Sequence, residues 1–145
     1  MSNPIHPLIR PPQLKRGDVV GVVAPAGPVD RNQLDKGLEV IRAMGFEPQL
    51  GKHVYARSRF MAGPDKERAQ DLIDMFRNPE VRAIFCARGG YGVNRILSYL
   101  KPAIIRANPK VVVGSSDITL LLNFLVQNCG LVAFHGPMVA GSFGR

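Results

Sequence analysis

One turn in the sequence has residue types suited to nucleophilic chemistry. The stretch Gly-Ser-Ser-Asp at 114–117 follows three valines at 111–113, and this β-branched run predicts a strand buried on both faces. The dense apolar segment after the turn, to about residue 126, predicts a buried helix. A serine on a turn between a buried strand and a buried helix is placed as an exposed nucleophile would be.

The residues of this turn leave two interpretations open. The nucleophile elbow has the form Gly-x-Ser-x-Gly. Gly114, Ser115 and Ser116 match its first three positions, but Ile118 occupies the place of the second glycine. In the other interpretation Ser115 or Ser116 only caps the helix, because serine is a favoured N-cap residue.

A second turn, Arg-Gly-Gly-Tyr-Gly at 88–92, could complete an acyl-transfer site. That chemistry needs a nucleophile, a base and hydrogen-bond donors for the oxyanion. Ser116 offers the nucleophile, and the amide of Asp117 offers one donor. Gly90, or less favourably Gly89, offers a second donor because a glycine places no Cβ between its amide and the substrate. The alternative is an ordinary tight turn, and the spacing is not that of a phosphate-binding loop.

The general base is the missing component. The chain has three histidines: His6 in a proline-rich segment, His53 in a basic loop, and His135 after a predicted strand. Only His135 lies at the expected end of the sheet, and there an orienting or packing role is favoured over catalysis. No group of Cys, His and carboxylate residues has metal-ligand spacing, so neither a metal nor a cofactor is expected.

Strands and helices alternate along the chain, which predicts an α/β fold with a parallel sheet covered on both faces. Ligands bind such sheets at the carboxyl ends of the strands, where both special turns fall. The expected strands are 19–24, 46–50, 81–86, 111–113 and 131–134, and the expected helices are 31–44, 64–77, 93–100 and the segment from the serine turn to about 128.

Composition sets limits on the class of protein. The 145 residues are 46% hydrophobic and 21% charged, which fits one globular domain, and no apolar run approaches a membrane span. The formal charge is +8, and residues 81–145 hold 7 basic residues against one acid. These charges are scattered and no nucleic-acid-binding motif accompanies them, so neither nucleic acid nor membrane is an expected partner. Cys86 and Cys129 are expected to be buried in a reducing compartment.

The N-terminal segment differs from the rest of the chain. Four prolines within residues 1–16 predict an extended arm, since prolines at this density prevent a helix or central strand. The segment lacks the basic and apolar regions of a secretory signal, which favours the cytoplasm. Residues 17–145 are then expected to form the nucleophile-bearing domain.

Five segments, in order along the chain, resemble the LD-carboxypeptidase family, which includes the muramoyltetrapeptide carboxypeptidases and the microcin-immunity peptidases. The similarity extends from about residue 14 to 141. The segments are Val-Val-Ala-Pro-Ala-Gly at 22–27, Ala-Gly-Pro-Asp-Lys-Glu-Arg at 62–68, the glycine-rich turn at 88–92, Gly-Ser-Ser-Asp-Ile-Thr at 114–119 and His-Gly-Pro-Met at 135–138.

The resemblance implies a flavodoxin-like N-terminal domain that carries a nucleophilic serine, Ser116. It also implies that a Ser-His-Glu triad is completed by a C-terminal domain, which this chain lacks, so the chain alone is expected to be inactive. The implied substrate is a murein tetrapeptide, from which a terminal D-amino acid is removed in peptidoglycan recycling. The substrate-binding residues are then expected to be Arg88, Gly89, Tyr91, Ser115 and His135.

Two other expectations accompany this one. The alternative function is a non-catalytic module that binds a peptide or a partner. Loss of a covering domain would also expose apolar surface and favour a homodimer.

Overall fold

The computed structural model describes residues 7–144 and contains one five-stranded parallel sheet. The strand order is β2-β1-β3-β4-β5, and every neighbouring pair is parallel. This is the flavodoxin-like order, so the α/β fold expected from the sequence is confirmed. The strands are β1 (Val19–Val23), β2 (Glu47–Leu50), β3 (Val81–Cys86), β4 (Val111–Gly114) and β5 (Phe134–His135).

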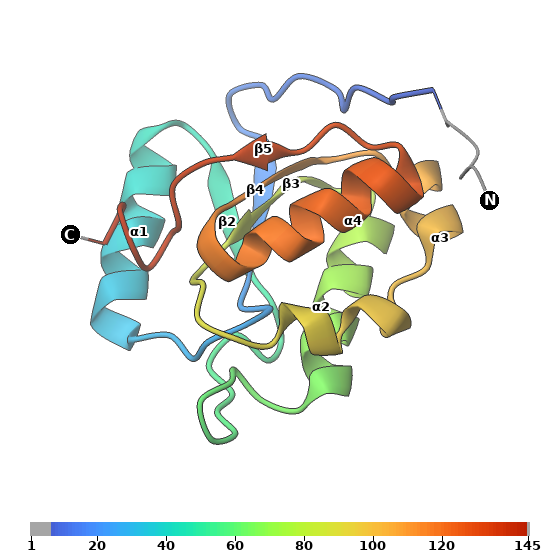
Figure 1. The fold of residues 1–145 in the computed structure, drawn as a ribbon. Coiled ribbons are helices and arrows are strands. Elements are labelled where there is room, and N and C mark those ends of the chain that lie inside the picture. The colour runs from blue at the N-terminus through green and yellow to red at the C-terminus, as the bar shows by residue number, and fades with distance from the viewer. Residues whose placement is uncertain (1–6, 145) are drawn as a thin grey trace.

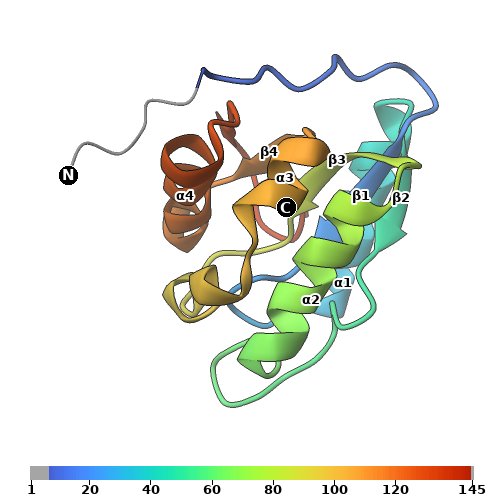
Figure 2. The same ribbon diagram turned by 90° about the vertical axis from the view of Figure 1, so that its right-hand side faces the viewer.

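Within residues 7–144, four α-helices cover the sheet, α1 on one face and the other three on the opposite face (Figures 1 and 2). Alternate residues of β3 serve the two cores: Ala83 and Phe85 pack toward α1, whereas Ile84 and Cys86 pack toward α2 and α4. The helices are α1 (Arg31–Ala43), α2 (Asp65–Arg77), α3 (Pro102–Ala107) and α4 (Thr119–Cys129). No helix within residues 7–144 is both long and apolar enough to cross a membrane.

The helix ends follow local chemistry. The Asp30 side chain accepts a hydrogen bond from the Gln33 amide and caps α1 as the sequence predicts. At the other end Gly45 has φ = 92°, and Gly130 closes α4 with φ = 64°. Pro64 is the N-cap of α2 rather than its first helical residue.

The prediction of a helix over 93–100 is wrong. The segment forms two 3₁₀ turns, Val93–Arg95 and Leu97–Tyr99, between the glycine turn and α3. Pro102 is the first residue of α3 and restricts Lys101 to an extended conformation, so no helix can continue across this point.

The last strand is also displaced from its expected position. β5 is Phe134–His135, whereas 131–134 was the expected range. The backbone of Leu131 forms an isolated bridge with Ile9 of the N-terminal segment: the Ile9 amide donates to Gly130 O at 2.6 Å, and the Val132 amide donates to Ile9 O at 3.0 Å. Pairing with β4 therefore begins only at Phe134. Of the expected arm, residues 1–6 lie outside the described residues.

Candidate active site

Ser116 has a backbone conformation that L-residues rarely adopt. Its φ is 55°, and within residues 7–144 only Arg59 is another non-glycine residue with positive φ. Ser116 is exposed, whereas Ser115 is half-buried with an ordinary extended φ of −154°. Ser115 is the N-cap of the 3₁₀ turn but its side chain makes no capping hydrogen bond, and the N-cap of α4 is Ile118, so side-chain capping does not explain the two serines. A strained and exposed serine after a buried strand is the geometry of a nucleophile elbow.

The tightness of the turn depends on Gly114 and Ile118. A Cβ at Gly114 would lie 2.4 Å from Ile118 Cγ2, so only glycine allows this approach. Ile118, which replaces the second glycine of the motif, is fully buried over Gly114. Residues Ser116–Ile118 form a 3₁₀ turn, and α4 starts one residue later. Ile118, in place of the second glycine of the motif, therefore fills the core beneath the turn, and Ser116 remains exposed.

The strain at Ser116 predicts an unusual response to glycine. A left-handed conformation costs an L-residue about 1–2 kcal/mol, whereas glycine adopts it freely. We expect Ser116→Gly to leave the free energy of unfolding unchanged or to raise it by up to about 1 kcal/mol. Ser115→Gly, at ordinary φ, should lower it by roughly 0.5–1 kcal/mol. Urea unfolding of both variants measures the difference, and equal destabilisation by the two would argue against strain at Ser116.

The glycine-rich turn lies directly against Ser116. A Cβ on Gly89 would lie 3.0 Å from Ser116 Oγ, and the Gly89 carbonyl accepts a hydrogen bond from the Gly27 amide at 2.8 Å. Gly90 has φ = 106°, which requires glycine. No protein acceptor within residues 7–144 binds the amides of Gly90 or Asp117. Both amides are therefore available to a ligand beside the serine.

The side chain of Asp117 has a role that the sequence did not indicate. Its Oδ2 accepts a hydrogen bond from the Val93 amide at 3.0 Å, which ties the serine turn to the end of the glycine turn. A charge-assisted bond of this kind fixes the spacing between the two turns. The sequence predicts a role only for the backbone amide of Asp117, as an oxyanion donor.

A buried arginine connects three loops at this edge of the sheet. Arg68 is 1% exposed, and its guanidinium donates to Pro25 O at 2.7 Å, Gly92 O at 2.9 Å and Gly63 O at 3.1 Å. It also pairs with the carboxylate of Asp65. Burial lowers the pKa of Arg68, while Asp65 opposes that shift. From the sequence, Arg68 is predicted only to lie at the start of a helix, because helical spacing does not indicate that its side chain contacts loops elsewhere in the chain.

The remaining expected substrate contacts lie around this centre. Arg88 is exposed, and its Nη1 donates a hydrogen bond to Pro28 O at 2.6 Å. Tyr91 is exposed at the end of the glycine turn. His135 pairs with Gly114 in the β4–β5 register and is also exposed. All eight predicted site residues thus lie at the carboxyl ends of β3, β4 and β5: Arg88, Gly89, Gly90, Tyr91, Ser115, Ser116, Asp117 and His135.

His53 forms a separate histidine–carboxylate pair. Its Nδ1 lies 2.7 Å from Asp71 Oδ1, and its amide donates to Asp71 Oδ2 at 2.8 Å. This pair lies beside β2, three strand positions from β4, or roughly 14 Å at the usual strand spacing. It is therefore not positioned to serve Ser116.

The described residues give little support to a metal site or to a cysteine nucleophile. No cluster of three or more His, Cys, Asp or Glu residues within 7–144 could hold a metal ion. Cys86 and Cys129 are buried free thiols, as expected. Burial raises the pKa of Cys86 to about 12 and that of Cys129 to about 11, so neither is a thiolate nucleophile at neutral pH.

The sheet order and the two turns define a flavodoxin-like α/β domain with its candidate site at the carboxyl ends of β3 and β4. Residues 20–136 match the LD-carboxypeptidase N-terminal domain of peptidase family S66, and the chain belongs to this family.

Relatives and solved structures agree with this assignment. The probable murein peptide carboxypeptidase of Bacillus subtilis is 44% identical over 93% of this chain and 42% of its own length. The murein tetrapeptide carboxypeptidase of Pseudomonas aeruginosa is 37% identical over 84% of this chain and 40% of its own length. The crystal structure of an MccF-like protein from Bacillus anthracis superposes with a TM-score of 0.90 at 36% identity, over 94% of this chain and 42% of that one. The chain thus spans less than half the length of these proteins.

Proposed function

We propose that this chain is the nucleophile-bearing part of a serine-type LD-carboxypeptidase. Ser116 attacks the carbonyl carbon of the terminal peptide bond, and the amides of Asp117 and Gly90 stabilise the oxyanion. The observation that carries this proposal is the exposed Ser116 with φ = 55°, in contact range of Gly89. Acyl transfer uses such a strained serine beside backbone donors, whereas a structural turn has no need of the strain.

The proposed substrate is a murein tetrapeptide that loses its terminal D-amino acid. The names of the Bacillus and Pseudomonas relatives support this substrate class. The net charge of +8 suits a carboxylate-rich peptide. Arg88, Tyr91, Ser115 and His135 are proposed to contact it from around the serine.

The base is proposed to come from outside residues 17–145, from a C-terminal domain that carries a histidine and a glutamate. His53 is engaged by Asp71 at the far side of the sheet, and His135 is exposed without a carboxylate partner among the described residues. The site of action is proposed to be the cytoplasm, where peptides released from peptidoglycan are recycled.

A phosphonate analogue of the tetrapeptide tests the oxyanion assignment. Its tetrahedral anionic group imitates the reaction intermediate, so it should bind about 100-fold or more tightly than the tetrapeptide itself. In ¹⁵N-labelled protein we expect the amide resonances of Gly90 and Asp117 to move most. Ser116→Ala should retain binding, because the amide donors remain. Binding that leaves both amides unperturbed would contradict the proposed oxyanion hole.

A further inference from the structure

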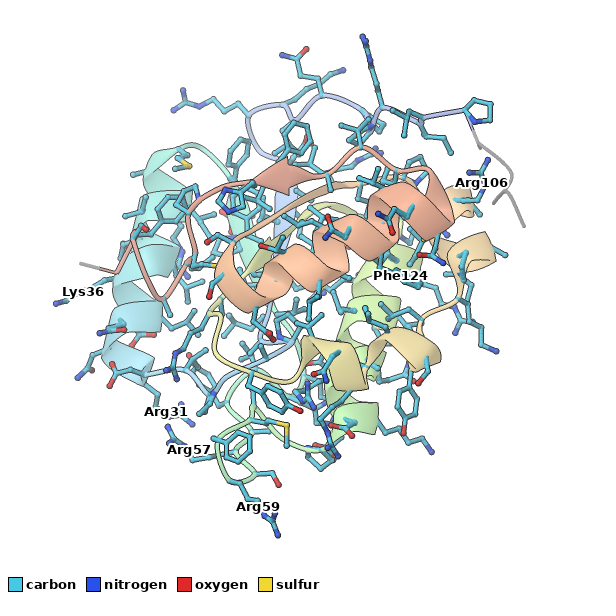
Figure 3. All side chains as sticks on the ribbon, in the orientation of Figure 1. Arg31, Lys36, Arg57, Arg59, Arg106 and Phe124 are labelled. Atoms are coloured by element: carbon cyan, nitrogen blue, oxygen red, sulfur yellow. The ribbon has the colours of Figure 1, made fainter. Side chains whose placement is uncertain are left out.

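A tight turn near the site carries the second strained residue of the described chain. Ser58 and Met61 exchange both backbone hydrogen bonds, at 2.9 and 3.0 Å, and enclose only Arg59 and Phe60. Arg59 has φ = 57°. Strained conformations persist where the surrounding structure enforces them, and they concentrate at functional sites. Figure 3 shows Arg57 and Arg59 on this projecting loop.

The turn forms one wall of an open cavity of about 580 Å³. Phe60 and Tyr91 are 61% and 44% exposed, and their ring centroids are 5.7 Å apart at an interplanar angle of 59°. Two exposed aromatic rings in contact offer apolar surface to a ligand. The residues that line the cavity include Arg59, Phe60, Met61, Asp65, Tyr91 and Arg95.

The cavity has a surplus of positive charge. Arg95 Nε donates to both carboxylate oxygens of Asp65 at 3.1 Å, and the buried guanidinium of Arg68 pairs with the same carboxylate. The hydrogen bond from Arg95 holds the pKa of Asp65 below its ordinary value, so this carboxylate stays ionised at neutral pH. Arg59 makes no ion pair within residues 7–144. Two guanidinium groups, those of Arg59 and Arg95, therefore line the cavity with one carboxylate, that of Asp65, which favours an anionic ligand.

The cavity borders the proposed oxyanion loop through Tyr91, which lines it. Tyr91 directly follows Gly90, and the sulfur of Met61 lies against the guanidinium of Arg68, which holds Gly92 O. A ligand seated against the Phe60 and Tyr91 rings therefore lies near the residues that would bind the reacting carbonyl.

We propose that this cavity binds the part of the peptide substrate on the amino side of the scissile bond, through a segment that carries a carboxylate. The inference rests on the proposed function. A carboxypeptidase releases a single residue, which is far smaller than a cavity of this volume, whereas the retained peptide matches the usual size of a ligand site. The aromatic pair contacts the apolar part of the peptide, and Arg59 and Arg95 attract its carboxylate.

Titration of the 145-residue protein with the murein tetrapeptide tests the inference, by calorimetry for affinity and by amide chemical shifts for location. Phe60→Ala, Tyr91→Ala and Arg59→Gly should each weaken binding about 10-fold. The substituted side chains of Phe60 and Tyr91 are exposed, and glycine suits the positive φ at Arg59, so all three variants should fold. A tetrapeptide with its internal carboxyl groups amidated should bind about as weakly as these variants.

Tyr99→Ala is the matched control, because Tyr99 is also 44% exposed but does not line the cavity. It should bind the tetrapeptide as the parent does. If the tetrapeptide shifts only the amides of the serine and glycine turns, and Phe60→Ala and Arg59→Gly bind it normally, the inference is overturned while the proposed function stands. If the tetrapeptide does not bind at millimolar concentration, both are overturned.

Discussion

Ser116→Ala is expected to reduce cleavage of a murein tetrapeptide by about 10⁶-fold in kcat, once the chain is joined to the C-terminal part of a relative. The serine would form the covalent intermediate, and no other hydroxyl-bearing residue within residues 7–144 has positive φ. Only the oxyanion donors and substrate binding would remain, which together give roughly 10³–10⁴-fold over the uncatalysed rate. Release of the terminal D-amino acid, followed by chromatography, measures the change.

Ser115→Ala provides the control at the neighbouring position. Its extended backbone and half-buried side chain separate Ser115 from the geometry of Ser116, so kcat should change little. A loss for Ser115→Ala as large as that for Ser116→Ala would show that the wrong serine had been assigned.

The 145-residue chain on its own should show no practical turnover of the same peptide. A serine hydroxyl is protonated at neutral pH and is a weak nucleophile without an adjacent base. If the chain cleaves the tetrapeptide unaided, the base lies within it. His135, in register with Gly114 on the adjacent strand, would then be the first residue to substitute.

Arg68→Met is expected to lower the free energy of unfolding by about 3–5 kcal/mol. The guanidinium is 1% exposed and satisfies the carbonyls of Pro25, Gly63 and Gly92. Methionine would leave these carbonyls without their donor in a site closed to water, and would remove a charge partner of Asp65. Urea unfolding monitored by circular dichroism measures the loss.

Lys66→Met is the control from the same helical turn, because Lys66 is exposed and makes no ion pair within the described residues. Its free energy of unfolding should stay within about 0.5 kcal/mol of the parent. A loss below about 1 kcal/mol for Arg68→Met would contradict a central role of Arg68 in holding the three loops together.

The sequence predicted the elements whose signals are local. The valine run before Gly114, the Asp30 cap and the glycine after α1 each determine their own structure. The displacement of β5 depends instead on Ile9, more than 100 residues away in sequence, whose backbone pairs with Leu131. Periodicity cannot detect a competing partner at that distance.

The candidate site also has parts that local sequence signals predict and parts that depend on contacts between distant residues. Ser116 and the glycine turn could be identified because a strained turn needs particular residue types. The contacts that hold these turns in place join Arg68 to carbonyls on three loops, and the Asp117 carboxylate to the Val93 amide. They use backbone acceptors and donors, which carry no signature in the sequence. Arg88 shows the opposite case. Its charge and its place beside the predicted site suggest a substrate contact, but in the structure its side chain donates to the Pro28 carbonyl.

The most direct test of the central claim is to locate the acyl group. The joined protein is mixed with the tetrapeptide, quenched in acid within milliseconds, digested and analysed by mass spectrometry. We expect an acyl adduct on Ser116, retained in Ser115→Ala and absent in Ser116→Ala. An adduct on Ser115, or cleavage that persists in Ser116→Ala, would contradict it.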